Sequence, residues 1–156
     1  ILHMGWSEQA YAIGFDPDQL TADRLAVERA TTGGQRVVAY FALAATGVAN
    51  DSGAVPGAVR RQAPKEVPCL ILARRAVDQS FQGKSLGRRL FQDGLWRSAR
   101  VAKDVGFRAL LVHARDERAA EFYKALTPSF RSSPSDALHL FLPLKAIGRL
   151  AETSCK

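Results

Sequence analysis

The chain has 156 residues, of which 47% are hydrophobic and 24% charged. These values exclude collagen-like, low-complexity and wholly disordered chains, and the length suits about one domain. No apolar run approaches the roughly 20 residues of a membrane-spanning helix. Two cysteines, Cys69 and Cys155, make neither a disulfide framework nor a zinc-ligand spacing. We therefore expect a cytoplasmic protein without a metal and without a membrane contact.

The positive charge is concentrated in the middle of the chain. Lys and Arg number 22 against 15 Asp and Glu, for a net charge of +7. Residues 60–131 hold 16 basic and 7 acidic residues, or +9, whereas the other positions hold 6 and 8, or −2. This distribution favours a polyanionic partner such as a nucleic acid, although many globular domains are this basic without one.

The N-terminal third predicts a β-hairpin. We expect residues 1–4 to be a processing or cloning remnant, and Met4 is a candidate for the native start. The weakly periodic segment 5–21 predicts a short helix or a loop. Alternation over 24–30 predicts a strand, and Gly33-Gly34 supplies the positive φ values of a tight turn.

The middle of the chain reads as strand, loop, strand and helix. Residues 36–46, rich in Val and aromatics, predict the returning strand of the hairpin. Residues 49–64 collect Gly, Ser, Pro and Asn and predict a surface loop. The apolar run 68–73 predicts a central strand. Apolar residues three to five apart then predict a helix over 86–102, ended by Gly106.

The C-terminal third completes a single α/β domain. Residues 107–113 predict a buried strand, Asp116 is placed to cap a helix that runs to Leu126, and residues 137–143 predict the last strand. The alternation of strands and helices predicts one mixed sheet. We expect the domain to occupy residues 5–148, followed by a tail at 149–156.

The chemically informative element is the turn at 82–87. A glycine-bearing turn that opens a helix directs backbone N–H groups at one point and adds the positive end of the helix dipole, which suits a pyrophosphate. Gly83 and Gly87 permit close approach of a ligand. The spacing is neither that of a Walker A loop nor that of the dinucleotide motif. The alternative is an ordinary strand-to-helix turn.

Three segments carry a resemblance to a known family. Residues 72–90, LARRAVDQSFQGKSLGRRL, resemble the acetyl-CoA signature of GNAT acetyltransferases. Residues 112–124 and 138–145, VHARDERAAEFYK and LHLFLPLK, resemble the GNAT toxins of bacterial type II toxin–antitoxin systems. The resemblance spans roughly 36–145. It implies the GNAT fold, a mixed and mostly antiparallel sheet flanked by helices, and acetyl transfer from acetyl-CoA to the amino group of aminoacyl-tRNA, which blocks translation.

The resemblance also implies a cofactor site. Ala76 and Val77 would offer backbone groups to the pantetheine arm. Where the family usually has glycine, this chain has Ser85, whose Cβ narrows the approach. The residues that would surround the pyrophosphate are Gln82, Gly83, Lys84, Ser85, Leu86, Gly87 and Arg88.

Tyr123 matches the family tyrosine near the thioester sulfur. A phenol stays protonated at neutral pH and can protonate the departing thiolate. The alternative is that Tyr123 only packs its helix against the sheet. No general base is evident, because His113 and His139 lie in apolar strands where histidines are mostly structural, and water can suffice.

Arg75 and Arg89 are the tRNA-contact candidates, and phosphate contacts of this kind weaken with salt. The family further implies a homodimer, a ribbon-helix-helix antitoxin, and operator DNA bound mainly through that antitoxin. Two alternatives remain at the level of sequence. One is a GNAT enzyme that acetylates a protein N-terminus or a small amine; the other is a non-catalytic module with a degenerate cofactor site.

Overall fold

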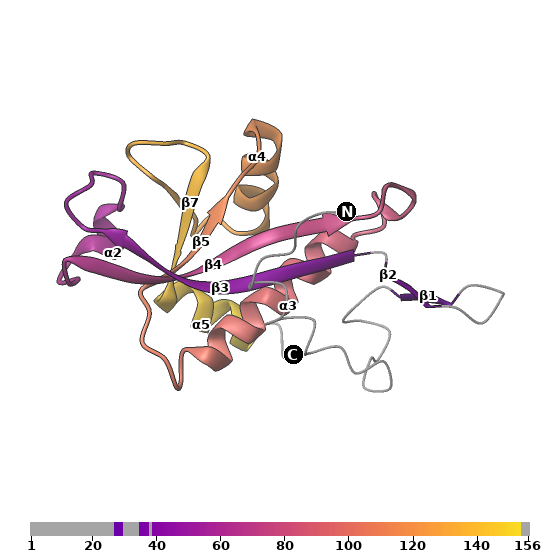
Figure 1. Ribbon diagram of the computed structural model, residues 1–156, viewed down its shortest axis with the longest axis horizontal. Helices are drawn as coiled ribbons and strands as arrows, with labels where there is room; N and C mark the ends of the chain where they lie inside the picture. Colours follow the sequence, from indigo (N-terminus) through magenta and orange to yellow (C-terminus); the bar gives the residue numbers. More distant parts are fainter. Residues whose placement is uncertain (1–26, 30–34, 38, 154–156) are drawn as a thin grey trace. The chain divides into compact units, whose positions relative to one another are not determined.

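The computed structural model describes residues 27–29, 35–37 and 39–153 (Figure 1). The expected remnant at 1–4, the segment 5–21 and the Gly33-Gly34 turn lie outside these residues. The chain divides into two compact units, Ile1–Leu43 with Ala73–Gly94 and Ala44–Leu72 with Leu95–Lys156. Each unit is described by itself below.

The first unit contains the predicted hairpin pairing. Strand β1 (Val27–Arg29) pairs antiparallel with β2 (Gln35–Val37), so that Val27 lies opposite Val37. The predicted returning strand over 36–46 falls on two described strands, and residue 38 between them lies outside the described residues. Strand β2 belongs to a two-stranded sheet with β1, whereas β3 (Ala39–Ala49) belongs to a five-stranded sheet.

The same unit carries the end of β4 (Glu66–Val77), which is longer than the predicted run 68–73. A 3-10 helix, Gln79–Phe81, follows the strand. The first half of helix α3 (Leu86–Val101) comes next, so the predicted helix over 86–102 is confirmed. The turn singled out in the sequence lies between these elements.

The second unit contains the mixed part of the sheet, whose strand order is β3-β4-β5-β7-β6. Strand β5 (Ala109–His113) runs parallel to β4, with Cys69 opposite Ala109. Strand β7 (His139–Pro143) is antiparallel to β5, and β6 (Arg131–Ser132) is antiparallel to β7. Among the three pairings described here, one is parallel and two are antiparallel, which agrees with the expected mixed, mostly antiparallel sheet.

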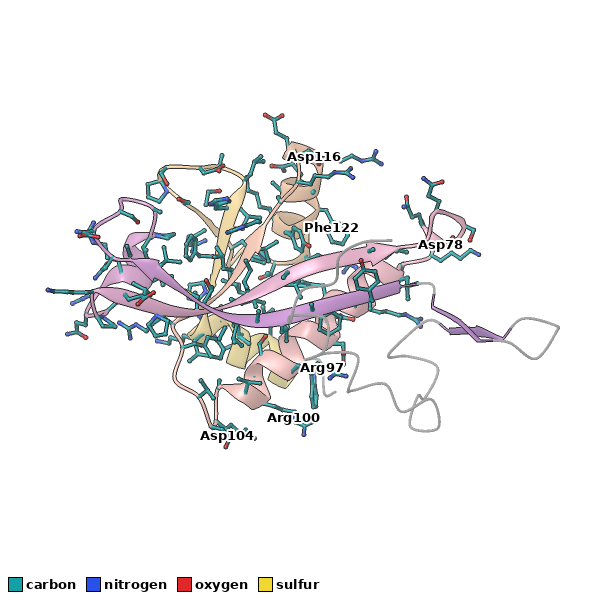
Figure 2. All side chains as sticks on the ribbon, viewed as in Figure 1. Asp78, Arg97, Arg100, Asp104, Asp116 and Phe122 are labelled. Carbon is teal, nitrogen blue, oxygen red and sulfur yellow. The ribbon has the colours of Figure 1, made fainter. Side chains whose placement is uncertain are left out.

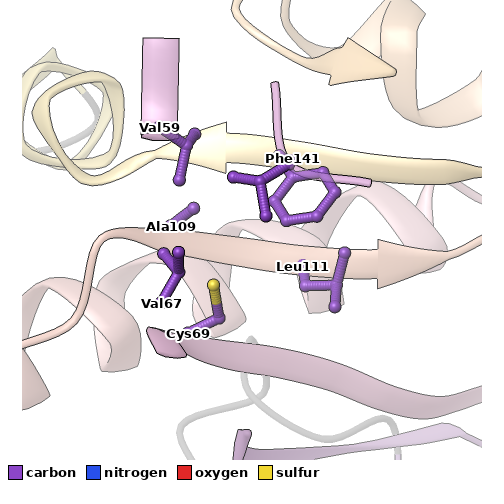
Figure 3. Packing of buried hydrophobic residues seen from close by; sticks show 7 residues of the cluster. Val59, Val67, Cys69, Ala109, Leu111 and Phe141 are labelled. Atoms are coloured by element: carbon purple, nitrogen blue, oxygen red, sulfur yellow. The ribbon is translucent and has the colours of Figure 1, made fainter. Parts of the chain in front are cut away.

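A hydrophobic cluster holds this unit together (Figure 3). It includes a short helix, α2 (Gly57–Arg60), within the segment that was expected to be a plain loop. Val55, just before the helix, and Val59, inside it, are both buried, which anchors this segment in the cluster. The buried members are Val55, Val59, Val67, Cys69, Ala109, Leu111 and Phe141.

Two helices complete the second unit. Helix α4 (Glu117–Leu126) begins at the predicted cap, Asp116. The sequence did not predict helix α5 (Leu144–Thr153), which starts directly after β7, contacts it, and contains the buried residues Ala146 and Ile147. The expected domain boundary at residue 148 falls inside α5.

Candidate active site

The turn between β4 and α3 is organised by side chains of the turn itself. The Asp78 carboxylate caps the 3-10 helix, because its Oδ1 accepts hydrogen bonds from the backbone N–H of Ser80 at 2.9 Å and from the Ser80 hydroxyl at 2.5 Å. The Gln82 side-chain amide donates to the carbonyl oxygen of Val77 at 3.3 Å. The end of β4 is thereby connected to the start of the turn (Figure 2, near the label Asp78).

Two residues of the turn adopt left-handed backbone conformations. Gly83 has φ +77° and Ser85 has φ +60°. Glycine adopts such angles without cost, whereas a residue with a Cβ is strained. The glycine that the resemblance leads us to expect at position 85 would adopt this φ without cost, and Ser85 reaches the same conformation at some cost.

Helix α3 starts from this turn. The Ser85 carbonyl accepts a hydrogen bond from the backbone N–H of Arg89 at 3.2 Å, the first i→i−4 bond at this end of the helix. An α-helix leaves the N–H groups of its first turn without acceptors inside the helix, and its dipole adds positive potential there. Gln82, Gly83, Lys84, Ser85 and Arg88 are exposed, while Leu86 and Gly87 are half-buried. The turn can therefore receive an anion from solvent.

The remaining predicted cofactor and tRNA residues occupy neighbouring positions in the same unit. Ala76 and Val77 are the last two residues of β4; Ala76 is exposed and Val77 half-buried. Arg89 is an exposed residue of α3. Arg75 lies in β4, and only its backbone is described. The structure thus places the whole predicted cofactor set in one continuous strand–turn–helix segment.

Tyr123 belongs to the other unit, on helix α4. Its side chain is buried, with 5% exposed. The ring meets Phe122 edge-on at a centroid distance of 5.4 Å and Phe130 at 6.0 Å (Figure 2 labels Phe122). An aromatic cluster of this kind fixes the ring plane of the tyrosine. Both interpretations of Tyr123, as packing residue and as acid, are compatible with a fixed, buried phenol.

The start of α4 is fixed by Asp116. Its Oδ1 accepts a hydrogen bond of 2.8 Å from the backbone N–H of Ala119, and Arg115 contacts the other carboxylate oxygen at 3.1 Å. The Ala119 bond, followed by the Arg115 bond, lowers the pKa of the Asp116 carboxyl. Asp116 is therefore ionised at neutral pH and acts as the expected cap.

Both histidines lie in the expected strands, each at a strand end. His113 is the last residue of β5 and is exposed, and His139 is the first residue of β7. Their rings are stacked, with centroids 3.9 Å apart and planes 15° apart. Strand alternation showed that both lie on apolar strands but could not reveal that the strand register brings them together.

The described part of the chain contains no cluster of three or more His, Cys, Asp or Glu side chains suited to a metal ion. Within the same residues, no helix is both long and apolar enough to cross a membrane.

Comparison with known proteins identifies similar chains, although no family model matches. A tRNA-acetylating toxin of Mycobacterium tuberculosis is 44% identical over 110 residues, which cover 70% of this chain and 64% of the toxin. The chain thus spans slightly less than two thirds of that relative's length.

Solved structures of two further toxins share the fold. A tyrosine-to-phenylalanine mutant of KacT is 27% identical, with a TM-score of 0.69 over 81% of this chain and 72% of KacT. AtaT complexed with acetyl-methionyl-tRNAfMet is 29% identical, with a TM-score of 0.63 over 73% of this chain and 66% of AtaT. A mutant of AtaT has also been solved with acetyl-CoA and the C-terminus of the antitoxin AtaR, and KacTA has been solved as a complex with DNA.

Proposed function

We propose that this chain, which has the fold of the GNAT-type acetyltransferase toxins and resembles them in sequence, is a toxin that acetylates aminoacyl-tRNA. The acetyl group comes from acetyl-CoA, and the modified amino group blocks translation. The observation that carries the proposal is the exposed turn with Gly83 and Ser85 at positive φ, which opens α3 directly after β4. It occurs in a chain 44% identical to a tRNA-acetylating toxin.

The turn fits the diphosphate of acetyl-CoA. Its backbone N–H groups and the N-terminus of α3 supply donors and positive potential, and the exposed Lys84 and Arg88 add two cations beside them. The backbone of Ala76 and Val77 lies on the strand side of the turn, where the pantetheine arm would run along β4. The other proposed contacts are Gln82, Gly83, Ser85, Leu86 and Gly87. The acetyl-CoA complex of AtaT supports this choice of ligand.

Acetyl transfer requires the protein to position the two substrates and to supply one proton. The uncharged α-amino group attacks the thioester carbonyl carbon, a C–N bond forms and the C–S bond breaks. The attacking amine loses its proton to water, and the departing thiolate takes a proton from the Tyr123 phenol. A buried phenol that contacts Phe122 and Phe130 suits this role, because its hydroxyl can donate a proton and the neighbouring rings hold its plane. We propose Tyr123 as the general acid.

The charge of the chain suits an RNA substrate. The +9 excess over residues 60–131 includes Arg75 and Arg89, which we propose as contacts to tRNA phosphates. Arg89 is exposed on the first turns of α3 and is accessible to such a ligand. AtaT has been solved with an acetylated initiator tRNA, which supports the same class of substrate.

The proposed partners rest on the similarity to KacT and AtaT. KacTA has been solved as a complex with DNA, and a mutant of AtaT with the C-terminus of the antitoxin AtaR. We propose that this protein acts in the cytoplasm as a homodimer, and that a ribbon-helix-helix antitoxin neutralises it and supplies most of the contact to operator DNA.

A degenerate, non-catalytic site is the second candidate, since Ser85 is a strained non-glycine residue where the resemblance leads us to expect glycine. Isothermal titration with acetyl-CoA separates the two. Measurable binding supports the enzyme, and no binding at millimolar acetyl-CoA supports the degenerate module.

The experiment that tests the function uses labelled acetyl-CoA and bulk aminoacyl-tRNA, with deacylated tRNA, an N-terminal peptide and spermidine as competing acceptors. Label on aminoacyl-tRNA alone is the expected result. Label on the peptide or the polyamine instead would identify a different GNAT enzyme. No label on any acceptor would refute acetyl transfer.

A further inference from the structure

A pair of stacked imidazoles lies at the end of β5, outside the residues assigned above. His113 and His139 are directly opposite each other in the antiparallel register of β5 and β7, so their side chains lie on the same face of the sheet. The ring centroids are 3.9 Å apart and the planes differ by 15°. Two rings in this geometry form a flat aromatic platform.

The backbone around the platform is held by a network of hydrogen bonds. The Asp136 carboxylate accepts a bond from the backbone N–H of Leu138 at 2.9 Å, and its other oxygen lies 3.5 Å from Nε2 of His139. The N–H of Ala114 donates to the Leu138 carbonyl at 2.8 Å. The Asp136 carboxylate thus lies beside the ring of His139, and the ring of His113 is stacked on that of His139.

The outer ring is neutral and accessible at physiological pH. His113 is exposed, and burial, followed by the neighbouring His139, lowers its pKa from the ordinary value while Asp136 acts weakly in the opposite direction. A neutral, preordered ring with an accessible surface is suited to stack on a flat uncharged group. In RNA the matching group is an unpaired base.

We propose that His113, supported by His139, stacks on an unpaired base of the tRNA 3′ end. The inference rests on the proposed function, because that function brings an aminoacylated 3′ end to this unit. The placement agrees with it: β5 ends at His113, α4 begins at Glu117, and Tyr123 lies six residues into that helix. Six residues of helix rise only about 9 Å. The platform therefore precedes the proposed acid closely along the chain, within the same unit.

Binding of tRNA tests the platform without requiring turnover. The affinities of fluorescein-labelled intact tRNA, and of the same tRNA with its unpaired 3′ nucleotides removed, are measured by anisotropy for the wild type, His113→Ala and His113→Phe. The wild type is expected to prefer intact tRNA about tenfold, the effect of one base stack. His113→Ala should lose that preference, and His113→Phe should retain it, because phenylalanine stacks but carries no proton. Trp96→Ala, which removes another exposed aromatic ring, is the matched control and should leave the preference unchanged.

The outcomes separate this inference from the proposed function. A preference that persists in His113→Ala would overturn the platform even if the protein acetylates tRNA. A preference lost equally in His113→Ala and His113→Phe would also overturn stacking and indicate a hydrogen-bonding or proton-transfer role. Failure of the wild type to acetylate aminoacyl-tRNA would instead refute the proposed function, whatever the anisotropy gives. Thermal unfolding of each variant checks that the sheet is intact.

Discussion

The Asp116 carboxylate accepts a hydrogen bond from the backbone N–H of Ala119 at 2.8 Å and so fixes the first turn of the helix that carries Tyr123. A cap of this kind satisfies a donor that the helix itself leaves unpaired. The position of the proposed acid thus depends on a surface carboxylate seven residues earlier in the chain.

Asp116→Ala is expected to lower the melting temperature and to reduce acetyl transfer, because the first turn of α4 frays and Tyr123 is less well placed. Asp116→Asn keeps an oxygen acceptor and should stay close to the wild type in both measurements. Equal loss in the two variants would show that charge, and not the Ala119 bond, matters at this position.

The same carboxyl predicts a pH dependence. Its pKa is lowered in the folded protein, first by the Ala119 bond and then by Arg115, so its contribution to stability is present above its ordinary pKa of 3.8. The contribution is lost as pH falls through the lower folded value. Urea unfolding should therefore show the wild type more stable than Asp116→Ala at pH 7 and the gap narrowing below about pH 4. A constant gap down to pH 2 would contradict this origin.

Gly83 allows a test of the turn before α3. Its φ of +77° strains any residue with a Cβ, and a Cβ built there would meet no protein atom within 4 Å. Gly83→Ala should cost about 1 kcal/mol of stability and weaken acetyl-CoA binding, because the turn distorts and the methyl group faces the ligand. Calorimetry measures the affinity. Gly106→Ala, at a glycine with equally open surroundings and no positive φ, is the control and should bind acetyl-CoA normally.

Replacing Ser85 by glycine should have the opposite effect on backbone strain. Since its φ is +60°, Ser85→Gly is expected to relieve about 1 kcal/mol of backbone strain and to leave acetyl-CoA affinity equal or higher. Lower affinity after this substitution would show that the Ser85 hydroxyl contributes a contact that outweighs the strain.

Cys69 should be chemically inert in the folded protein. It is 2% exposed, and burial raises the pKa of its thiol to about 11. In a Cys155→Ser background, a thiol reagent at pH 8 should label Cys69 only after unfolding. Rapid labelling of the native protein would contradict the packing of the cluster shown in Figure 3.

Local signals in the sequence predicted a large part of this fold. The pairing of 27–29 with 35–37, the Asp116 cap and the start of α3 all rest on patterns within a few residues, and each is confirmed. Helix α2 was missed because a four-residue helix with Gly and Pro around it has the composition of a loop. Helix α5 was missed although Leu144, Ile147 and Leu150 recur at helical spacing, a signal that could have been used.

The candidate site also has features that the sequence predicts and features that it does not predict. The glycine-bearing turn was readable, because glycine spacing before a helix has a direct backbone meaning. The left-handed conformation of Ser85 could not be predicted from the sequence, because serine rarely adopts it and only the turn as a whole imposes it. The stack of His113 on His139 depends on the register of two strands far apart in the chain, which no local pattern encodes.

The most direct test of the central claim is the single-turnover rate of acetyl transfer to aminoacyl-tRNA by Tyr123→Phe, with acetyl-CoA affinity measured on the same sample. Phenylalanine keeps the ring between Phe122 and Phe130 and removes only the phenolic proton donor. We expect the rate to fall by at least about a hundredfold while the acetyl-CoA dissociation constant changes less than about twofold. Phe122→Leu, which alters the neighbouring ring, should retain most of the activity. A Tyr123→Phe protein that acetylates tRNA at the wild-type rate would contradict the assignment of Tyr123 as the acid.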